Sequence, residues 1–202
     1  MSTKQLERRE PKQLRARHTV EAVLSAAVRI LKREGVNGLT TNRIAEIAGV
    51  SIGSLYQYFP DKNAIFAALH RRHIEEIDRM IHEVLTRYAA SELHSLIRAL
   101  IEAMIDAHTK DPELYELLAA EVPHRAGSTE EFAVRLHGVF RLAISSRIHK
   151  KKKLRDLDKT VFIVTNMVET LSHGATLRRP PNVSLNEAKE EAVRAVLAYL
   201  NA

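Results

Sequence analysis

Residues 39–66, LTTNRIAEIAGVSIGSLYQYFPDKNAIF, carry the strongest local signal in this chain of 202 residues. Thr40 or Thr41 is suited to cap one short helix, and Ser51 is suited to cap a second. Gly49 lies between them and supplies the backbone conformation that lets two short helices cross through a tight turn. The stretch therefore predicts a helix-turn-helix, a unit whose second helix can enter the major groove of DNA.

The second of these short helices begins with small and polar residues. Its first turn consists of Ser51, Ile52, Gly53 and Ser54, and Gln57 follows on the same face. The amide of a glutamine both donates and accepts, as N6 and N7 of adenine require, and the side chain of Ile52 can contact the methyl group of a thymine. We therefore expect this face to contact base edges.

Basic residues are concentrated in the first third of the chain. Residues 1–72 hold 13 Lys and Arg against 6 Asp and Glu, whereas the other 130 residues hold 18 against 19. The formal net charge of +6 therefore arises from the N-terminal part. Such an asymmetry is typical of proteins that bind polyanions, but it also occurs where a basic face contacts only water. Composition leaves both interpretations open.

The composition excludes several kinds of site. The chain has no cysteine, so it forms no disulfide, no thiolate metal site and no cysteine nucleophile. No stretch approaches the roughly 20 consecutive apolar residues that cross a bilayer. The opening MSTKQLERREPKQLRARH lacks the apolar core of a secretion signal. We therefore expect a cytoplasmic protein.

Apolar residues recur at spacings of three and four along nearly the whole chain, which is the period of an α-helix. An apolar stripe from Val20 to Leu31 predicts a first helix that ends at Gly35, and a long helix is expected from Pro60 to Tyr88. Further helices are expected at about 92–109, 112–121, 129–149, 156–178 and 184–201. The pattern predicts an all-α fold of about nine helices.

The segment from residue 17 to residue 69 resembles the DNA-binding domain of the tetracycline-repressor-like (TetR) family. The shared features are an amphipathic helix that ends in EGV, the stretch LTTNRIAEIAGVS, then GSLYQYF, a polar cap and Lys62. This ordered combination is more specific than a lone helix-turn-helix. The resemblance implies a DNA-binding domain at 14–60 with a basic tail at 1–13, and a helical ligand-binding and dimerisation domain at 61–202.

The resemblance also assigns DNA contacts to individual residues. It implies that Thr41 and Tyr56 contact phosphate, and that Lys62 contacts backbone phosphate at the start of the long helix. Thr40 and Arg43 can add contacts to the backbone of the DNA. The residues that match the groove-facing positions are Ser51, Ile52, Gly53, Ser54, Gln57 and Tyr58.

For some of these residues, a structural role is the alternative to a DNA contact. Thr40 and Thr41 are helix caps first, Phe59 is expected to pack in the core, and Tyr56 can do both. The lysine run at 150–153 is either an exposed loop or a second phosphate contact. Five basic residues of the N-terminal tail either reach a minor groove or stay solvated: Arg8, Arg9, Lys12, Arg15 and Arg17.

The resemblance implies that the second domain encloses a cavity for a small-molecule effector. The residues expected to line it are Met104, His108, Tyr115, Leu118, Phe140, Phe162, Asn166, Met167 and Thr170. The apolar members of this set can equally be core, and the polar members can equally lie on the surface or be satisfied in the core.

The resemblance further implies a homodimer formed through the last two helices. Residues 161–171, VFIVTNMVETL, are apolar nearly all round. The last helix repeats small and apolar residues, namely Ala188, Ala192, Val193, Val196, Leu197 and Leu200. Two-fold symmetry would present two recognition helices to one DNA duplex, which favours a pseudo-palindromic operator.

No enzymatic activity, cofactor or metal is expected. His70 and His73 lie three residues apart, and Glu169 and His173 lie four apart, but no third ligand is visible near either pair. HEVL at 82–85 lacks the second histidine of HExxH, and the chain has no phosphate-binding glycine loop and no GxSxG turn. We therefore expect a ligand-responsive transcriptional repressor that a small-molecule effector releases from double-stranded DNA. The alternatives are a nonspecific or architectural DNA-binding protein and a small helical enzyme.

Overall fold

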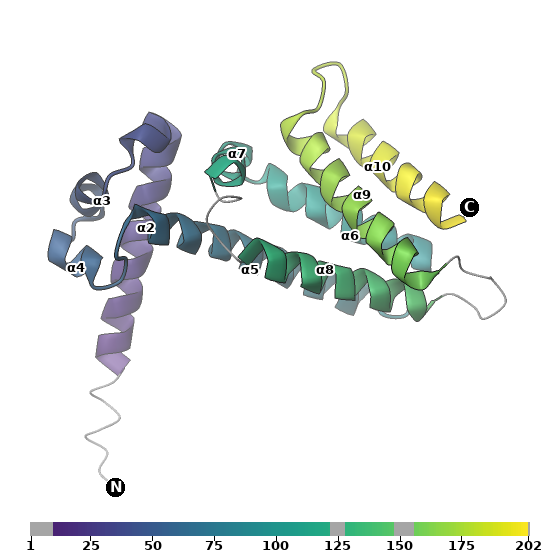
Figure 1. Ribbon diagram of the computed structural model, residues 1–202, viewed down its shortest axis with the longest axis horizontal. Helices are drawn as coiled ribbons and strands as arrows, with labels where there is room; N and C mark the ends of the chain where they lie inside the picture. The colour runs from purple at the N-terminus through teal and green to yellow at the C-terminus, as the bar shows by residue number, and fades with distance from the viewer. Residues whose placement is uncertain (1–9, 122–127, 148–155, 202) are drawn as a thin grey trace, which may run out of the picture. The chain divides into compact units, whose positions relative to one another are not determined.

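The computed structural model describes residues 10–121, 128–147 and 156–201 (Figure 1). These ranges contain nine α-helices and no strand, which confirms the expected all-α fold. The helices are α2 (Glu10–Gly38), α3 (Thr41–Ala48), α4 (Ile52–Tyr56), α5 (Lys62–Arg87), α6 (Leu93–Thr109), α7 (Pro112–Glu121), α8 (Ser128–Ser145), α9 (Leu157–Leu177) and α10 (Leu185–Asn201). The lysine run at 150–153 and the tail residues Arg8 and Arg9 lie outside the described residues. No helix in the described ranges is long and apolar enough to span a bilayer.

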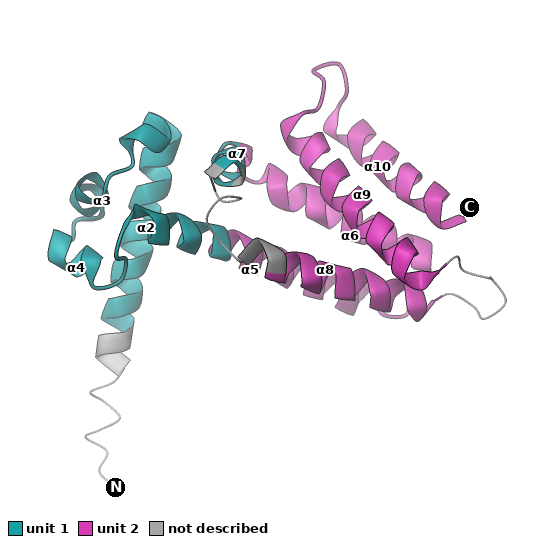
Figure 2. Cartoon of the chain, in the orientation of Figure 1, with its two compact units in different colours: residues 1–71, 113–126 teal, residues 72–112, 127–202 magenta. Residues whose placement is uncertain are grey.

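The chain divides into two compact units (Figure 2). The first comprises residues 1–71 and 113–126, and the second comprises residues 72–112 and 127–202. The expected boundary lay at residue 60, but the first unit also takes in the start of α5 and α7 from Glu113 onward. The reason is packing, because Phe66 of α5 and Leu118 of α7 are buried in the core of the first unit.

The helix that opens the first unit is interrupted near its end. Gly35, where the apolar stripe of the sequence ends, has φ 68° and ψ −167°, and helical backbone resumes as far as Gly38. A positive φ at this point favours glycine, because a side chain would strain the backbone. The interruption lets the chain turn toward α3, and Leu39 becomes buried in the core of the first unit.

The second unit is built around α9. This helix packs against α6, α8 and α10, and α10 also packs against α6. Fully buried side chains of the core include Ile97, Phe140, Val164 and Val196, one from each of these four helices. Contact on several sides explains why residues 161–171 are apolar nearly all round.

Arg147 closes the C-terminal end of α5. Its Nε donates to the carbonyl oxygen of Ser91 at 2.9 Å, and one terminal nitrogen donates to those of Tyr88 at 3.1 Å and Ala89 at 2.9 Å. These carbonyls belong to the turn that follows α5, and a guanidinium can satisfy several carbonyls at once. Arg147 lies two residues beyond α8, which ends at Ser145, earlier than the expected end at residue 149.

Candidate nucleic-acid interface

Side-chain and backbone caps fix the turn between α3 and α4. The hydroxyl of Thr40 accepts from the backbone N–H of Arg43 at 3.2 Å, so Thr40 is the N-cap of α3. Gly49 ends the helix in the left-handed conformation, with φ 67° and ψ 29°, and its N–H donates to the carbonyl oxygen of Glu46 at 3.2 Å. The structure confirms the predicted cap at Thr40 and the predicted turn at Gly49.

The predicted recognition helix is α4. The hydroxyl of Ser51 accepts from the backbone N–H of Ser54 at 3.1 Å, and their two hydroxyl oxygens are 2.8 Å apart. Leu55 is the only residue of α4 that is buried, and Phe59 beyond its end is also buried, as expected. The helix ends at Tyr56, whereas the sequence pattern predicted an end near Phe59. One apolar anchor therefore holds a short helix whose other side chains are free to face outward.

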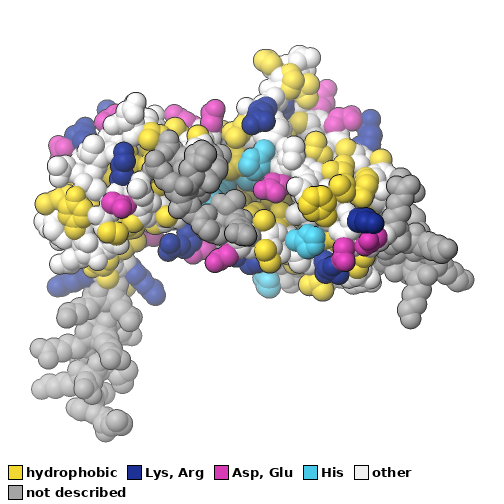
Figure 3. All heavy atoms as spheres, viewed as in Figure 1, with side chains coloured by type: hydrophobic (Ala, Val, Ile, Leu, Met, Phe, Trp, Pro, Cys, Tyr) yellow, Lys and Arg dark blue, Asp and Glu magenta, His cyan; other side chains and the backbone are white. Residues whose placement is uncertain are grey.

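Apolar and polar side chains share the outer face of α4 and the residues after it. Ile52 is 38% exposed, Tyr56 50% and Tyr58 39%. Ser51, Gly53 and Gln57 are also exposed. Figure 3 shows apolar side chains reaching the surface over α3 and α4. Exposed large apolar groups beside polar ones are typical of a contact surface.

The structure brings two of the expected phosphate contacts together. The hydroxyl oxygens of Thr41 on α3 and Tyr56 on α4 are 3.1 Å apart, within hydrogen-bonding distance. Lys62 is the first residue of α5 and is exposed. The carboxylate of Asp61 accepts from the backbone N–H of Ala64 at 2.8 Å, so Asp61 is the polar cap that precedes this helix.

Arg43 is engaged by acidic side chains. One terminal nitrogen donates to the carboxylate of Glu46 at 2.9 Å, and the other lies 3.5 Å from that of Glu34. The hydrogen bond and charge of Glu46, with a smaller contribution from Glu34, raise the pKa of Arg43 above its ordinary value. Arg43 therefore links α2 to α3, and a contact with phosphate would require it to leave these carboxylates.

The nine residues expected to line a ligand cavity do not form one set. Met104, His108 and Phe140 are buried in the second unit. Tyr115 and Leu118 are buried on α7, which belongs to the first unit. The others lie on α9: Met167 is half-buried, whereas Phe162, Asn166 and Thr170 are exposed.

A histidine cluster lies in the second unit. The ring of His108 on α6 has its centroid 5.3 Å from that of His73 on α5 and 5.4 Å from that of His173 on α9. Burial, and then the charges of the other two histidines, lower the pKa of His108 from its ordinary 6.5 to about 3. Burial also lowers the pKa of His173. His108 is therefore uncharged at neutral pH.

The second unit also buries two hydroxyl groups that the expected set did not include. The Oγ1 of Thr165 and the Oγ of Ser172 have no hydrogen-bond partner among the described residues. Their side chains are seven residues apart on α9, and this spacing places them on one side of the helix. The spacing was visible in the sequence, but it did not indicate which side of α9 is buried.

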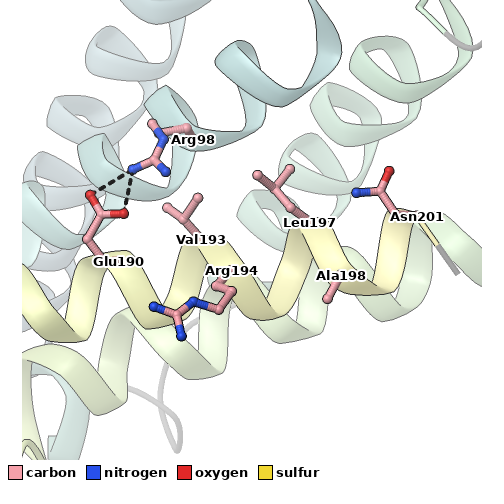
Figure 4. Close-up of a pocket in the computed structure, with 7 residues that line it drawn as sticks. All are labelled: Arg98, Glu190, Val193, Arg194, Leu197, Ala198 and Asn201. Carbon is pink, nitrogen blue, oxygen red and sulfur yellow. Dashed lines mark hydrogen bonds and ion pairs between the residues drawn. The ribbon is translucent and has the colours of Figure 1, made fainter.

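No three His, Asp or Glu side chains in the described ranges are arranged to hold a metal ion. The second unit does have a surface groove of about 360 Å³ between α6 and α10 (Figure 4). Arg98 of α6 faces Glu190 of α10 across it, with one guanidinium nitrogen 2.8 and 2.9 Å from the two carboxylate oxygens. The remaining lining residues are Val193, Arg194, Leu197, Ala198 and Asn201, so none of the nine expected ligand residues lines this groove.

Comparison with curated proteins finds relatives named nucleoid occlusion factor SlmA. The protein of that name from Haemophilus influenzae is 26% identical over 186 residues, which cover 88% of this chain and 80% of that protein. The one from Pasteurella multocida is 27% identical over 150 residues, which cover 70% of this chain and 73% of that protein.

Solved structures share the fold. A TetR-family transcriptional regulator from Streptomyces coelicolor matches with a TM-score of 0.61 at 19% identity, covering 91% of this chain and 98% of that one. A transcriptional regulator from Rhodococcus matches with a TM-score of 0.71 at 15% identity, covering 90% and 96%.

Two family models match the sequence. Residues 23–69 match that of the bacterial regulatory proteins of the tetR family, and residues 92–200 match the tetracyclin repressor-like C-terminal domain. The second match alone spans more than half of the chain. The protein therefore belongs to the TetR family of bacterial transcriptional regulators, which bind DNA through a helix-turn-helix and are not enzymes.

Proposed function

We propose that this protein is a ligand-responsive repressor that binds a pseudo-palindromic operator as a homodimer and leaves it when a small-molecule effector binds. The observation that carries the DNA-binding part is the outer face of α4. All three of Ile52, Gly53 and Gln57 are exposed there. Ile52 provides an apolar contact, Gly53 allows the backbone to approach closely, and Gln57 provides an amide. These are the features that base edges in the major groove require.

The residues around α4 divide into two roles. Ser51, Ile52, Gly53, Ser54, Gln57 and Tyr58 face the bases in this proposal. Thr41, Tyr56 and Lys62 contact phosphate in this proposal: Thr41 and Lys62 are the first residues of α3 and α5, where phosphate binds readily, and the hydroxyl of Tyr56 lies 3.1 Å from that of Thr41. Thr40 acts through its cap on α3, and Arg43 contacts phosphate only after it exchanges its carboxylate partners.

The dimer proposal rests on the outer faces of α9 and α10. Phe162 on α9 is 58% exposed although it is large and apolar. On α10 the small side chains of Ala195 and Ala198 are exposed. An exposed aromatic group beside small side chains suits close packing of helices against a second copy, which would form a four-helix interface.

The effector proposal assigns sensing to the second unit. Met104, His108 and Phe140 supply its buried part, while α5 continues without a break from the first unit into the second. An effector that binds one packing of the second unit more tightly than another would tilt α5 and change the spacing of the two recognition helices. It can shift this equilibrium only by its difference in affinity for the two states.

A second candidate function is favoured by the relatives. The chain is 26% identical over 186 residues to a protein named nucleoid occlusion factor SlmA, which it matches in both units. A role of that kind would need DNA binding but no effector. Mapping the binding sites of the protein over a chromosome separates the two functions, because a repressor occupies a few operators and a nucleoid occlusion factor is expected to occupy many dispersed sites.

Footprinting of the purified protein on the DNA upstream of its own gene, at several salt concentrations, tests the proposal. We expect a protected palindrome that survives competition by nonspecific DNA. Gln57→Ala should relax discrimination at one or two base pairs. Lys62→Ala should weaken binding to all sequences and reduce the slope of the logarithm of the binding constant against the logarithm of the salt concentration by about one. Protection of all sequences alike, lost as salt rises, would contradict the repressor and favour an architectural protein. Equal effects of the two substitutions would contradict the assigned roles.

A further inference from the structure

The interior of the second unit contains polar groups but no permanent charge. Among the described residues of that unit, the buried polar side chains are those of His108, Thr160, Thr165 and Ser172. No buried carboxylate, ammonium or guanidinium group accompanies them. Transferring a charged molecule into such surroundings is costly unless an opposite charge is present to pair with it.

Two of these groups have unmet hydrogen-bonding capacity. Ser172 is 0% exposed and Thr165 is 6% exposed, and within the part of the chain that the structure describes neither hydroxyl has a hydrogen-bond partner. Most buried hydroxyl groups in native proteins are hydrogen-bonded, and an unsatisfied one is destabilising. Seven residues along a helix correspond to a rise of about 10 Å, so one molecule of moderate length can reach both hydroxyls.

The histidine beside them adds an uncharged ring. The Nδ1 of His108 lies 2.7 Å from the carbonyl oxygen of Met104. A carbonyl oxygen only accepts, so Nδ1 of the neutral ring carries the hydrogen. The ring of His173, the residue that follows Ser172, lies against that of His108. The cluster therefore adjoins the part of α9 that carries one of the two unsatisfied hydroxyls.

We propose that the effector is an uncharged organic molecule that hydrogen-bonds to Ser172 and Thr165 beside His108. The alcohols, phenols and amides have this chemistry. The proposal rests on the ligand-responsive part of the proposed function and names the class of molecule that this function requires. It excludes carboxylate and ammonium effectors, because the described residues of the unit include no buried group that would neutralise them.

Stability of the free protein provides the first test. Thr165→Val keeps the shape of the side chain, and Ser172→Ala removes one oxygen, so each eliminates an unsatisfied hydroxyl. We expect each change to raise Tm by about 2–4 °C, the shift that corresponds to the removal of one such group in a protein of this size. Thr176→Val is the matched control, because its hydroxyl donates to the carbonyl oxygen of Ser172 at 3.0 Å, and it should not raise Tm. A Tm that falls for both Thr165→Val and Ser172→Ala would show that protein or water already satisfies the hydroxyls, and would overturn the proposal.

Binding of matched probes provides the second test. Calorimetry at neutral pH compares 2-naphthol, 2-naphthoate and 2-naphthylmethylammonium, and then 1-octanol, octanoate and octylammonium. We expect the neutral member of at least one series to bind tenfold or more tightly than its two ions. The double variant Thr165→Val with Ser172→Ala should lose about tenfold of that affinity, whereas Thr176→Val should keep it.

Two outcomes overturn the proposal: an ion that binds as tightly as its neutral counterpart, or no binding of either neutral probe at about 1 mM, the affinity of a weak complex. The operator footprint separates this failure from that of the proposed function. A protein that keeps its footprint but fails the probe test is still a regulator, whereas a protein without a footprint is not the proposed repressor.

Discussion

The two units of the molecule differ in where their hydroxyl groups lie and in whether these groups are hydrogen-bonded. In the first unit the hydroxyls of Thr41 and Tyr56, and those of Ser51 and Ser54, are paired at the surface around α4. In the second unit two hydroxyls are buried without partners among the described residues, and a histidine is held uncharged in the core. The first unit therefore has paired polar groups on the surface that we propose binds DNA, whereas the second has unpaired buried hydroxyls that we propose bind the effector.

The largest effect is expected when Leu55, the buried side chain that holds α4 in place, is shortened. Leu55 is 0% exposed and is the only buried residue of α4. Leu55→Ala removes most of its packing, and we expect a loss of about 2–5 kcal/mol in the free energy of unfolding, together with loss of operator binding. Urea denaturation and fluorescence anisotropy with operator DNA measure the two effects.

Leu142 on α8 provides the matched control for this substitution. Its side chain is 70% exposed, so Leu142→Ala should change stability little and leave DNA binding intact. If Leu55→Ala kept operator binding, α4 would not depend on its anchor for the contact with DNA that we propose.

The uncharged histidine of the second unit should make stability depend on pH. The pKa of His108 is about 3 in the folded protein and near 6.5 when unfolded, so the unfolded chain binds more protons between these values. Stability is then fully present above pH 6.5 and falls as the pH decreases toward 3, by up to about 1.4 kcal/mol per pH unit, or about 2 kcal/mol at pH 5. Urea denaturation at a series of pH values measures this slope.

His108→Gln should flatten the dependence between pH 6.5 and 5. The groups around His108 are the rings of His73 and His173, and the latter is itself near Glu169 and Arg178. His94→Gln is the control, because His94 is exposed and bonded to Asn201. An unchanged slope in His108→Gln would mean that other groups carry the pH dependence.

Much of the first unit could be predicted from the sequence because its structure follows local rules. The caps at Thr40 and Ser51 and the left-handed turn at Gly49 each depend on residues within a few positions. The carboxylate partners of Arg43 show the limit, since Glu34 lies on another helix. No local sequence pattern therefore predicted that Arg43 contacts both carboxylates.

The second unit could be predicted only in outline. Its helix ends were close to those expected, but α8 ends early, and just beyond it Arg147 donates to carbonyls more than fifty residues away in the chain, which no local pattern indicates. On α9, apolar residues surround the helix, so the sequence did not show that Phe162 is exposed while Thr165 and Ser172 are buried. Which face of such a helix is buried depends on its neighbours in space.

A smaller effect is expected from backbone strain at the turn of the first unit. A Cβ at Gly49 would meet nothing within 4 Å, so any cost of a side chain there comes from the positive φ alone. Gly49→Val should cost about 1–2 kcal/mol in the free energy of unfolding, and Gly49→Asn less, because asparagine adopts the left-handed conformation more readily. Thermal denaturation of both variants measures the difference.

At Gly53 of the same unit, a side chain is expected to stabilise the fold, whereas one at Gly49 is expected to destabilise it. It lies in α4, and a Cβ there would meet only the hydroxyl of Ser51 at 4.0 Å. Gly53→Ala should stabilise the protein by about 0.5–1 kcal/mol. It should nevertheless weaken operator binding, since it places a methyl group on the proposed DNA-facing surface. Tighter binding would show that the face of α4 is not closely apposed to DNA.

Effects of similar size are expected when one helix cap from each unit is removed. The hydroxyl of Ser51 accepts from the N–H of Ser54 at 3.1 Å, and that of Ser184 accepts from the N–H of Glu187 at 3.2 Å. Ser51→Ala and Ser184→Ala should each lower the free energy of unfolding by about 1 kcal/mol. Only Ser51→Ala should also weaken operator binding, because it alone lies at the start of the proposed recognition helix. Equal losses of DNA affinity in the two variants would mean that cap stability governs binding, and that the surface of α4 has no separate role in recognising DNA.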